Sequence, residues 1–136
     1  MENVKFKLES TDATKFDLEA FNNNDCVGSL RFEVVDNPFE YWYFLKEGEY
    51  QNEIGLDKYI LLDRLFIDPS CRRDQLRTRL MNGLIKIVKL RFIHYNILLE
   101  ADAFDGNISQ DDLIKFYQKF GFVQCGDFKN VLVRIT

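Results

Sequence analysis

The hydrophobic pattern changes its period near the middle of the chain, and this change predicts the best-defined part of the fold. Residues 59–67 (YILLDRLFI) form a short apolar run rich in branched side chains, which is typical of a buried strand. Asp68 and Pro69 interrupt the run, and from Leu76 onwards apolar residues recur every three or four positions. The pattern therefore predicts a strand, a tight turn and an amphipathic helix that lies on a sheet.

Period-two alternation predicts three strands at the start of the chain, over residues 4–9, 15–21 and 26–35. Short runs of Ser, Thr, Asn and Asp separate these strands, and such residues favour turns. The intervals between these three strands are too short to hold a helix. Residues 96–102 (NILLEAD) predict a further, buried strand after the central helix.

The end of the chain predicts one more helix and a hairpin. Ser109 followed by Asp112 is typical of a helix N-terminus, and Gly121 is the expected C-cap. Residues 122–125 and 131–135 are the expected strands of the final hairpin.

Residues 39–45 contain five aromatic side chains, among them Trp42, the only tryptophan of the chain. Two interpretations stay open for this run. Aromatic residues in a strand often pack in the core, but they can also line an acceptor pocket or a partner surface. The exposure of Trp42 would discriminate between them.

Positive charge is concentrated in one segment of an acidic protein. Residues 72–91 hold seven Lys or Arg and one acid, whereas the whole chain has a net charge of −4. This segment includes the start of the predicted helix, where backbone N–H groups and the helix dipole favour an anion. The sequence therefore predicts a phosphate-binding site at the turn.

Composition narrows the class of protein. A chain of 136 residues with 46% hydrophobic residues is long enough to bury a core, and we expect a single domain over residues 1–136. The three cysteines show neither a C-x-x-C motif nor a Cys/His ligand spacing, so no metal site and no disulfide framework are expected. The absence of a long apolar run or a secretory signal makes a cytoplasmic protein without membrane contact the default.

Two motifs carry a family resemblance. Residues 65–73 (LFIDPSCRR) resemble the strand and turn before the coenzyme A loop of GNAT-type N-acetyltransferases, and residues 116–122 (FYQKFGF) are similar to the F-Y-x-K-x-G-F segment near the end of that fold. The resemblance implies an α/β (α+β) fold with a mixed, mostly antiparallel twisted sheet of six to seven strands. It also implies a central parallel, splayed pair of strands and two main helices, with the helices of the first half missing or reduced.

The resemblance further implies acetyl-CoA as co-substrate. The implied cofactor contacts lie on the central strand and the loop after it: Phe66, Ile67, Arg72, Arg73, Asp74, Gln75, Leu76 and Arg77. Gln75 and Arg77 stand where the family has two glycines, which let the backbone approach a pyrophosphate. The two long side chains either block that approach or replace it with their own hydrogen-bond donors.

For catalysis, the resemblance implies that Tyr117 is the acid that protonates the leaving sulfur. The alternative is that Tyr117 only packs on the apolar face of its helix. The general base is expected to be a carboxylate, either Glu100 or Asp63. For Asp63, a salt bridge to Arg64 or Arg91 is the competing interpretation.

The sequence thus predicts an N-acetyltransferase that acts on an amine of a protein or a small molecule. The alternative is a catalytically inactive GNAT-like binding or inhibitor protein that acts through protein contacts, which the replaced glycines favour. Nucleic-acid binding through the basic helix is a third hypothesis, and the pI near 5.0 speaks against it.

Overall fold

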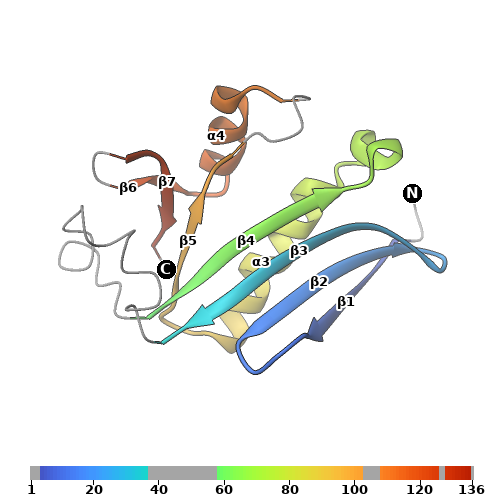
Figure 1. Cartoon of the computed structure of the whole chain (residues 1–136), viewed down its shortest axis with the longest axis horizontal. Helices are drawn as coiled ribbons and strands as arrows, with labels where there is room; N and C mark the ends of the chain where they lie inside the picture. Colours follow the sequence, from blue (N-terminus) through green and yellow to red (C-terminus); the bar gives the residue numbers. More distant parts are fainter. Residues whose placement is uncertain (1–3, 37–57, 103–107, 126–127, 136) are drawn as a thin grey trace. The chain divides into compact units, whose positions relative to one another are not determined.

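The computed structural model describes residues 4–36, 58–102, 108–125 and 128–135. Within them lies a seven-stranded mixed sheet in the order β1-β2-β3-β4-β5-β7-β6, with two main helices (Figure 1). In chain order the elements are β1 (Val4–Ser10), β2 (Lys15–Asn22), β3 (Asp25–Val35), β4 (Tyr59–Ile67), the 3₁₀ helix η2 (Pro69–Asp74), α3 (Leu76–Arg91), β5 (Asn96–Glu100), α4 (Gln110–Gln118), β6 (Val123–Cys125) and β7 (Phe128–Arg134). The mixed sheet and the two helices confirm the predicted fold class. The aromatic run with Trp42 lies outside the described residues.

The chain forms two compact units. The first holds the described residues of 1–33 and 62–93, and the second holds those of 34–61 and 94–136. In the first unit, β1, β2 and β3 pair antiparallel. Four residues separate β1 from β2, which confirms that no helix lies between the first two strands.

Helix α3 covers one face of the strands of the first unit. Its buried residues are Leu76, Leu80, Met81, Leu84 and Val88. The strands contribute Leu18, Ala20, Leu30 and Phe32 to the same core. Phe32 stacks on Phe16, with ring centroids 5.2 Å apart, and both rings meet Phe92 edge-on. Such burial, at about 25 cal/mol per Å² of apolar surface, stabilises the unit.

The opposite face of these strands is polar. Asp17 and Arg31 are register partners, and the guanidinium donates two hydrogen bonds to the carboxylate, at 2.9 and 3.2 Å. Burial and a hydrogen bond with Glu9 raise the pKa of the Glu19 carboxyl above its ordinary value. Charged residues that pair with one another therefore occupy this face.

The second unit contains β5, β7 and β6 in antiparallel pairing, with Leu98 opposite Val133 in its core. β7 begins at Phe128, three residues before the predicted start, because Cys125 already pairs with Phe128 and the backbone of Asn130 accepts a hydrogen bond from Ala101. The turn of the hairpin is correspondingly shorter than predicted.

Helix α4 begins as predicted. Ser109 is its N-cap, and its hydroxyl accepts a hydrogen bond from the backbone N–H of Asp112 at 3.1 Å. The C-terminus differs from the prediction, because Lys119 is the C-cap. Gly121 lies in the following turn with φ of 89°, so its left-handed backbone redirects the chain after the helix has ended.

Gly28 provides a test of the packing between β3, β4 and α3. A Cβ at this buried position would meet Ile67 Cδ1 at 3.0 Å, the backbone oxygen of Phe66 at 3.2 Å and Leu80 Cδ1 at 3.3 Å. Because backbone cannot move aside as a side chain does, we expect Gly28→Ala to lower the free energy of unfolding by about 1–3 kcal/mol. Urea denaturation of the full chain measures this change.

Gly83→Ala is the matched control. Its Cβ would meet only Leu18 Cδ2, at 3.0 Å, which is the end of a flexible side chain. Alanine also gains about 1 kcal/mol of helix propensity over glycine, so we expect stability close to that of the unmodified protein. Equal stability of both variants would contradict the packing described here.

Candidate functional site

The turn after β4 is held by Asp68. Its carboxylate accepts hydrogen bonds from the backbone N–H of Ser70 at 2.9 Å and from the Ser70 hydroxyl at 2.7 Å. The backbone oxygen of Asp68 accepts from the N–H of Cys71 at 2.8 Å, while its own N–H donates to Val27 on β3 at 2.9 Å. Asp68 thus fixes where the strand ends and η2 begins. Cys71 is 5% exposed, as expected of a small apolar residue.

Gln75 connects η2 to α3 in a left-handed conformation, with φ of 56° and ψ of 25°. Glycine adopts this conformation without steric cost, whereas other residues pay about 1–2 kcal/mol for it. The backbone at Gln75 therefore has a conformation that suits glycine, although the side chain is glutamine. The side chain is exposed and makes no capping hydrogen bond to α3.

The N-terminus of α3 is suited to an anion. The first helical hydrogen bond runs from Arg79 N–H to Gln75 O at 3.0 Å, so the amides of the first turn precede the helix's own hydrogen-bond ladder. The first turn contains no acidic residue. Arg77 is half-buried there and Arg79 is exposed, whereas Leu76 is fully buried and anchors the helix start. The helix dipole and two guanidinium groups favour negative charge at this point.

The remaining predicted cofactor residues of the loop, Arg72, Arg73 and Asp74, form the second half of η2. The other two lie at the end of β4: Phe66 is 41% exposed, and Ile67 is 4% exposed and packs towards Gly28 and α3. All eight predicted cofactor residues therefore belong to the first unit and lie on one continuous segment with α3.

Asp63 is exposed in the middle of β4. The described part of the chain shows no ion pair from Asp63 to Arg64 or Arg91, the two partners suggested by the sequence. The pKa of Arg31 lies above its ordinary value because of the hydrogen bond and the charge of Asp17, with a smaller contribution from the charge of Asp63. Asp63 therefore acts electrostatically on β3 and stays accessible to solvent.

Tyr117 and Glu100 belong to the second unit. Tyr117 is 7% exposed, and its ring meets the rings of Phe116 and Phe122 edge-on, at centroid distances of 5.3 and 5.8 Å. Glu100 is the exposed last residue of β5, opposite Val131. Tyr117 thus packs on its helix face, which one of the two interpretations predicted, and its role as an acid stays a prediction.

Gln110 links α4 to the end of β5. Its side-chain amide donates to the backbone oxygen of Ala101 at 2.8 Å and to the Asn130 side chain at 3.1 Å. These contacts hold the first residue of α4, the helix that carries Tyr117, against Ala101, which directly follows Glu100. The second unit therefore holds the proposed acid and one proposed base on elements that are tied to each other.

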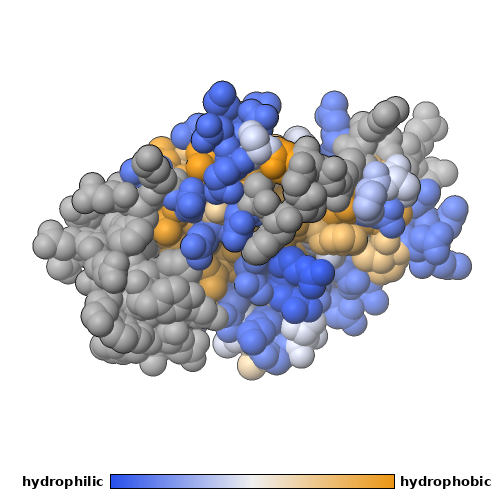
Figure 2. Space-filling model, turned by 45° about the horizontal axis from the view of Figure 1, so that its top comes forward, coloured by the Kyte–Doolittle hydropathy of each residue, from blue (hydrophilic) through white to orange (hydrophobic). Residues whose placement is uncertain are grey.

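Within the described ranges, no group of three His, Cys, Asp or Glu side chains is placed to hold a metal ion. None of the described helices is both long enough and apolar enough to cross a bilayer. Hydrophobic residues reach the surface between hydrophilic ones (Figure 2).

Sequence reasoning missed one exposed pair on β4. Arg64 lies over the ring of Phe66, with its Cζ 5.9 Å from the ring centroid. Residues two apart on a strand share a face, so this spacing was a usable signal. The apolar character of the surrounding run led instead to the expectation of a buried strand.

Comparisons with known proteins identify what the chain is similar to. The model of the acetyltransferase (GNAT) family matches residues 2–122. No curated protein sequence matches the chain.

Among solved structures, the anti-CRISPR protein AcrVA5 is similar with a TM-score of 0.59 and 16% identity, over 88% of this chain and 97% of that chain. An acyl-CoA N-acyltransferase from Pseudomonas aeruginosa gives the same TM-score, identity and coverage of this chain, and 68% of its own chain is covered. The PaiA N-acetyltransferase from Thermoplasma acidophilum, in complex with coenzyme A, gives a TM-score of 0.60 at 16% identity, over 90% of this chain and 62% of that one. At these identities, the likeness shows the shared fold.

The conformation of Gln75 leads to a prediction about stability. We expect Gln75→Gly to raise the free energy of unfolding by up to about 1 kcal/mol, because glycine removes the left-handed strain and loses part of that gain to its greater unfolded-state entropy. Gln75→Val should lower it by about 1 kcal/mol or more, since branched residues tolerate this conformation poorly. Chemical denaturation measures both changes.

Gln75→Ala serves as the control, because alanine keeps the strain and loses only a side chain that makes no cap. Its stability should stay within about 0.5 kcal/mol of the unmodified protein. A destabilising effect of Gln75→Gly would mean that the loop does not require a left-handed residue.

Proposed function

We propose that the chain, which belongs to the acetyltransferase (GNAT) family, is a cytoplasmic N-acetyltransferase that moves an acetyl group from acetyl-CoA to an amine of a protein or a small molecule. The start of α3 carries this proposal. It combines a left-handed entry residue, a first turn without acid and two guanidinium groups, one short 3₁₀ helix after the central strand. A helix N-terminus with these features favours a diphosphate.

In the proposed complex, the diphosphate of acetyl-CoA binds to the loop from Arg72 to Arg77. Family resemblance assigns the pantetheine arm to the backbone of Phe66 and Ile67, which it contacts as an added strand does. The guanidinium of Arg77 supplies hydrogen bonds that the glycine-containing loop makes with its backbone. The similar structure from Thermoplasma acidophilum is a complex with coenzyme A, which supports this choice of cofactor.

The proposed reaction is direct transfer. Glu100 or Asp63 takes a proton from the acceptor ammonium, directly or through water, so that the amine nitrogen has a free electron pair. The nitrogen attacks the thioester carbonyl, the C–N bond forms and the C–S bond breaks. Tyr117 donates its phenolic proton to the leaving sulfur, and the proton lost by the nitrogen restores the phenol through solvent. The products are an acetylated amine and coenzyme A with a free thiol.

A second candidate function has its own supporting observation. The chain and AcrVA5 cover each other almost end to end, and that protein is named an anti-CRISPR protein. Together with Gln75 and Arg77 at the glycine positions, this favours a binding or inhibitor protein built on the same fold. The enzyme and the inhibitor differ in whether acetyl-CoA binds.

Titration of the purified full chain with acetyl-CoA in a calorimeter tests the cofactor site. We expect binding, and we expect Arg77→Gly to weaken it about tenfold, because a charge-assisted hydrogen bond to phosphate is lost. The affinity of Arg77→Lys for acetyl-CoA should lie between those of the unmodified protein and Arg77→Gly, since lysine keeps the charge and loses the bidentate geometry.

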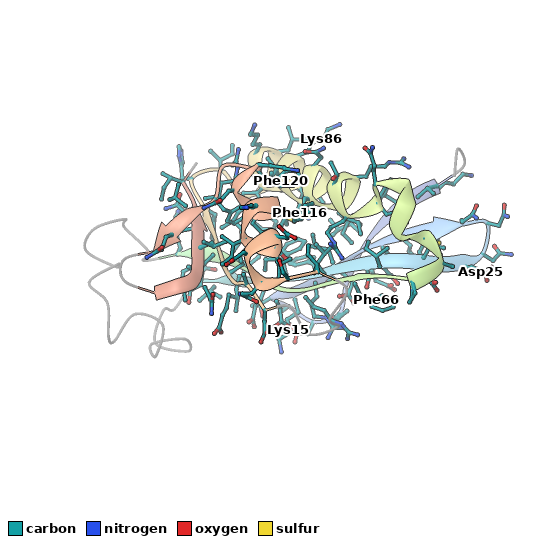
Figure 3. The ribbon with its side chains drawn as sticks, turned by 90° about the horizontal axis from the view of Figure 1, so that it is seen from above. Lys15, Asp25, Phe66, Lys86, Phe116 and Phe120 are labelled. Atoms are coloured by element: carbon teal, nitrogen blue, oxygen red, sulfur yellow. The ribbon has the colours of Figure 1, made fainter. Side chains whose placement is uncertain are left out.

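Lys86→Gln is the matched control. It removes one positive charge from the exposed side of α3, where Figure 3 shows Lys86. Lys86 follows Arg77 by nine residues, so the change should alter affinity by less than about twofold. Tighter binding by Arg77→Gly would mean that Arg77 obstructs the loop. No binding of acetyl-CoA at millimolar concentration would leave only the binding-protein function.

Substitution of Tyr117 tests the acid. We expect Tyr117→Phe to lower kcat about a hundredfold, because the ring still packs on Phe122 and only the donor proton is removed. Affinity for acetyl-CoA should stay within about twofold. The measurement is the rate of thiol release at saturating acetyl-CoA.

Tyr95→Phe is the control for the loss of a phenol. The Tyr95 hydroxyl donates to Asp36 at 2.6 Å, and its loss should affect stability and leave kcat unchanged. A Tyr117→Phe variant with the unmodified rate would remove Tyr117 from the mechanism and assign it to packing.

A further inference from the structure

The middle of β4 is uncovered although both of its ends are buried. Tyr59 and Ile60 are fully buried and Ile67 is 4% exposed, whereas Arg64 is exposed and Phe66 is 41% exposed. β4 lies between β3 and β5 in the sheet order. Interior strands of a sheet with parallel pairing are usually covered on both faces. An exposed segment in the middle of such a strand is therefore available to a ligand.

Arg64 and Phe66 share the face of β4 that points away from α3. Ile67 points towards α3, because its Cδ1 and that of Leu80 both lie beside the Cβ position of Gly28. Successive side chains of a strand alternate between faces, which puts Phe66 on the opposite side. Figure 3 shows Phe66 on the side of the sheet opposite Lys86 of α3. The Cζ of Arg64 lies over the Phe66 ring, 5.9 Å from its centroid, so the guanidinium is on the same side.

Arg64 has the chemistry of an anion-binding residue. In the described part of the chain, the Arg64 guanidinium contacts the ring of Phe66, and no described carboxylate lies within ion-pair distance of Arg64. Arg31, on the same sheet face, is already bound by Asp17 through two hydrogen bonds. Stacking on an aromatic ring orients a guanidinium and leaves its N–H groups free to bind a planar anion bidentately.

We propose that Arg64 and Phe66 recognise a carboxylate on the acceptor, so that the acceptor is an amine that also carries a carboxylate and an apolar stem. This inference rests on the proposed acetyl transfer only where it identifies the ligand as the acetyl acceptor. The binding of a carboxylate to Arg64 does not depend on catalysis. A planar guanidinium matches a carboxylate in geometry and binds it through two parallel N–H···O hydrogen bonds. The exposed ring of Phe66 contacts the apolar stem between carboxylate and amine.

Two pairs of compounds test the proposal, and in each pair only the carboxylate differs. The first pair is 6-aminohexanoate and 6-aminohexanamide, which represents a small-molecule acceptor. The second is the blocked dipeptide Lys-Glu amide and its Lys-Gln counterpart, which represents a lysine within a protein. The amine is remote from the changed group in both pairs, so its basicity is matched.

The first measurement is binding of the four compounds to the full chain without acetyl-CoA, followed by titration calorimetry, which reads the unmodified protein and its Arg64 variants alike. We expect the carboxylate member of at least one pair to bind about tenfold more tightly than its amide. Arg64→Gln should abolish the difference and Arg64→Lys should keep part of it. The pair that shows the preference identifies the source of the carboxylate.

Arg91→Gln is the matched control, since Arg91 is also exposed and its Cζ lies over an aromatic ring, that of Phe92, 5.9 Å from the centroid. It should leave the preference intact. Equal binding of both members in both pairs, or a preference that persists in Arg64→Gln, would overturn the proposal.

The second measurement is thiol release from acetyl-CoA with the same four compounds. Acetyl transfer at equal rates to the carboxylate and the amide members of both pairs would support the proposed function and contradict the proposed carboxylate site. Binding that depends on Arg64 without any thiol release would keep the carboxylate site and remove the proposed enzyme activity.

Discussion

The left-handed backbone at Gln75 is the constraint on which the rest of the candidate site depends. It ends η2 and starts α3 within one residue, so that a helix of sixteen residues begins close to the end of the central strand. Two other features make this geometry possible: Asp68 caps η2, and Leu76 is fully buried below the first turn. A residue other than glycine pays about 1–2 kcal/mol for the conformation, and such strain persists only where the surroundings impose it. The geometry of the helix start is thus a product of packing, and it does not require a glycine at position 75.

No helix lies between β1 and β2, and the face of these strands opposite α3 carries polar side chains. A sheet face that no helix covers must be compatible with water, and here Asp17, Glu19 and Arg31 provide this. The covered face, by contrast, buries Leu18, Leu30 and Phe32 under α3. The two faces of the first unit therefore differ: one forms the core, and the other presents polar groups and the Arg64–Phe66 pair.

The sequence predicted the bounds of β4 and the start of α3 well, because the change from a short apolar run to a 3.6-residue period is a local signal that Asp68 and Pro69 reinforce. It was less accurate where an element depends on a distant partner. β7 starts at Phe128 because of its pairing with β6 and β5, which local pattern does not report. The same limit applies to side chains. For Asp63 the sequence suggested a salt bridge to Arg64 or Arg91 as one interpretation, whereas the exposure of Asp63 and Arg64 depends on which neighbouring elements cover the strand.

The two proposed anion sites and the acidity of the chain lead to one hypothesis about the acceptor. Positive charge is gathered at the start of α3 and at Arg64, while the remainder of the chain is acidic enough to give a net charge of −4. A zwitterionic acceptor suits the proposed sites, since its carboxylate is attracted to the Arg64 guanidinium and its ammonium to a carboxylate that can remove a proton. A purely cationic acceptor would leave Arg64 without a role, and a purely anionic one would have no amine to acetylate.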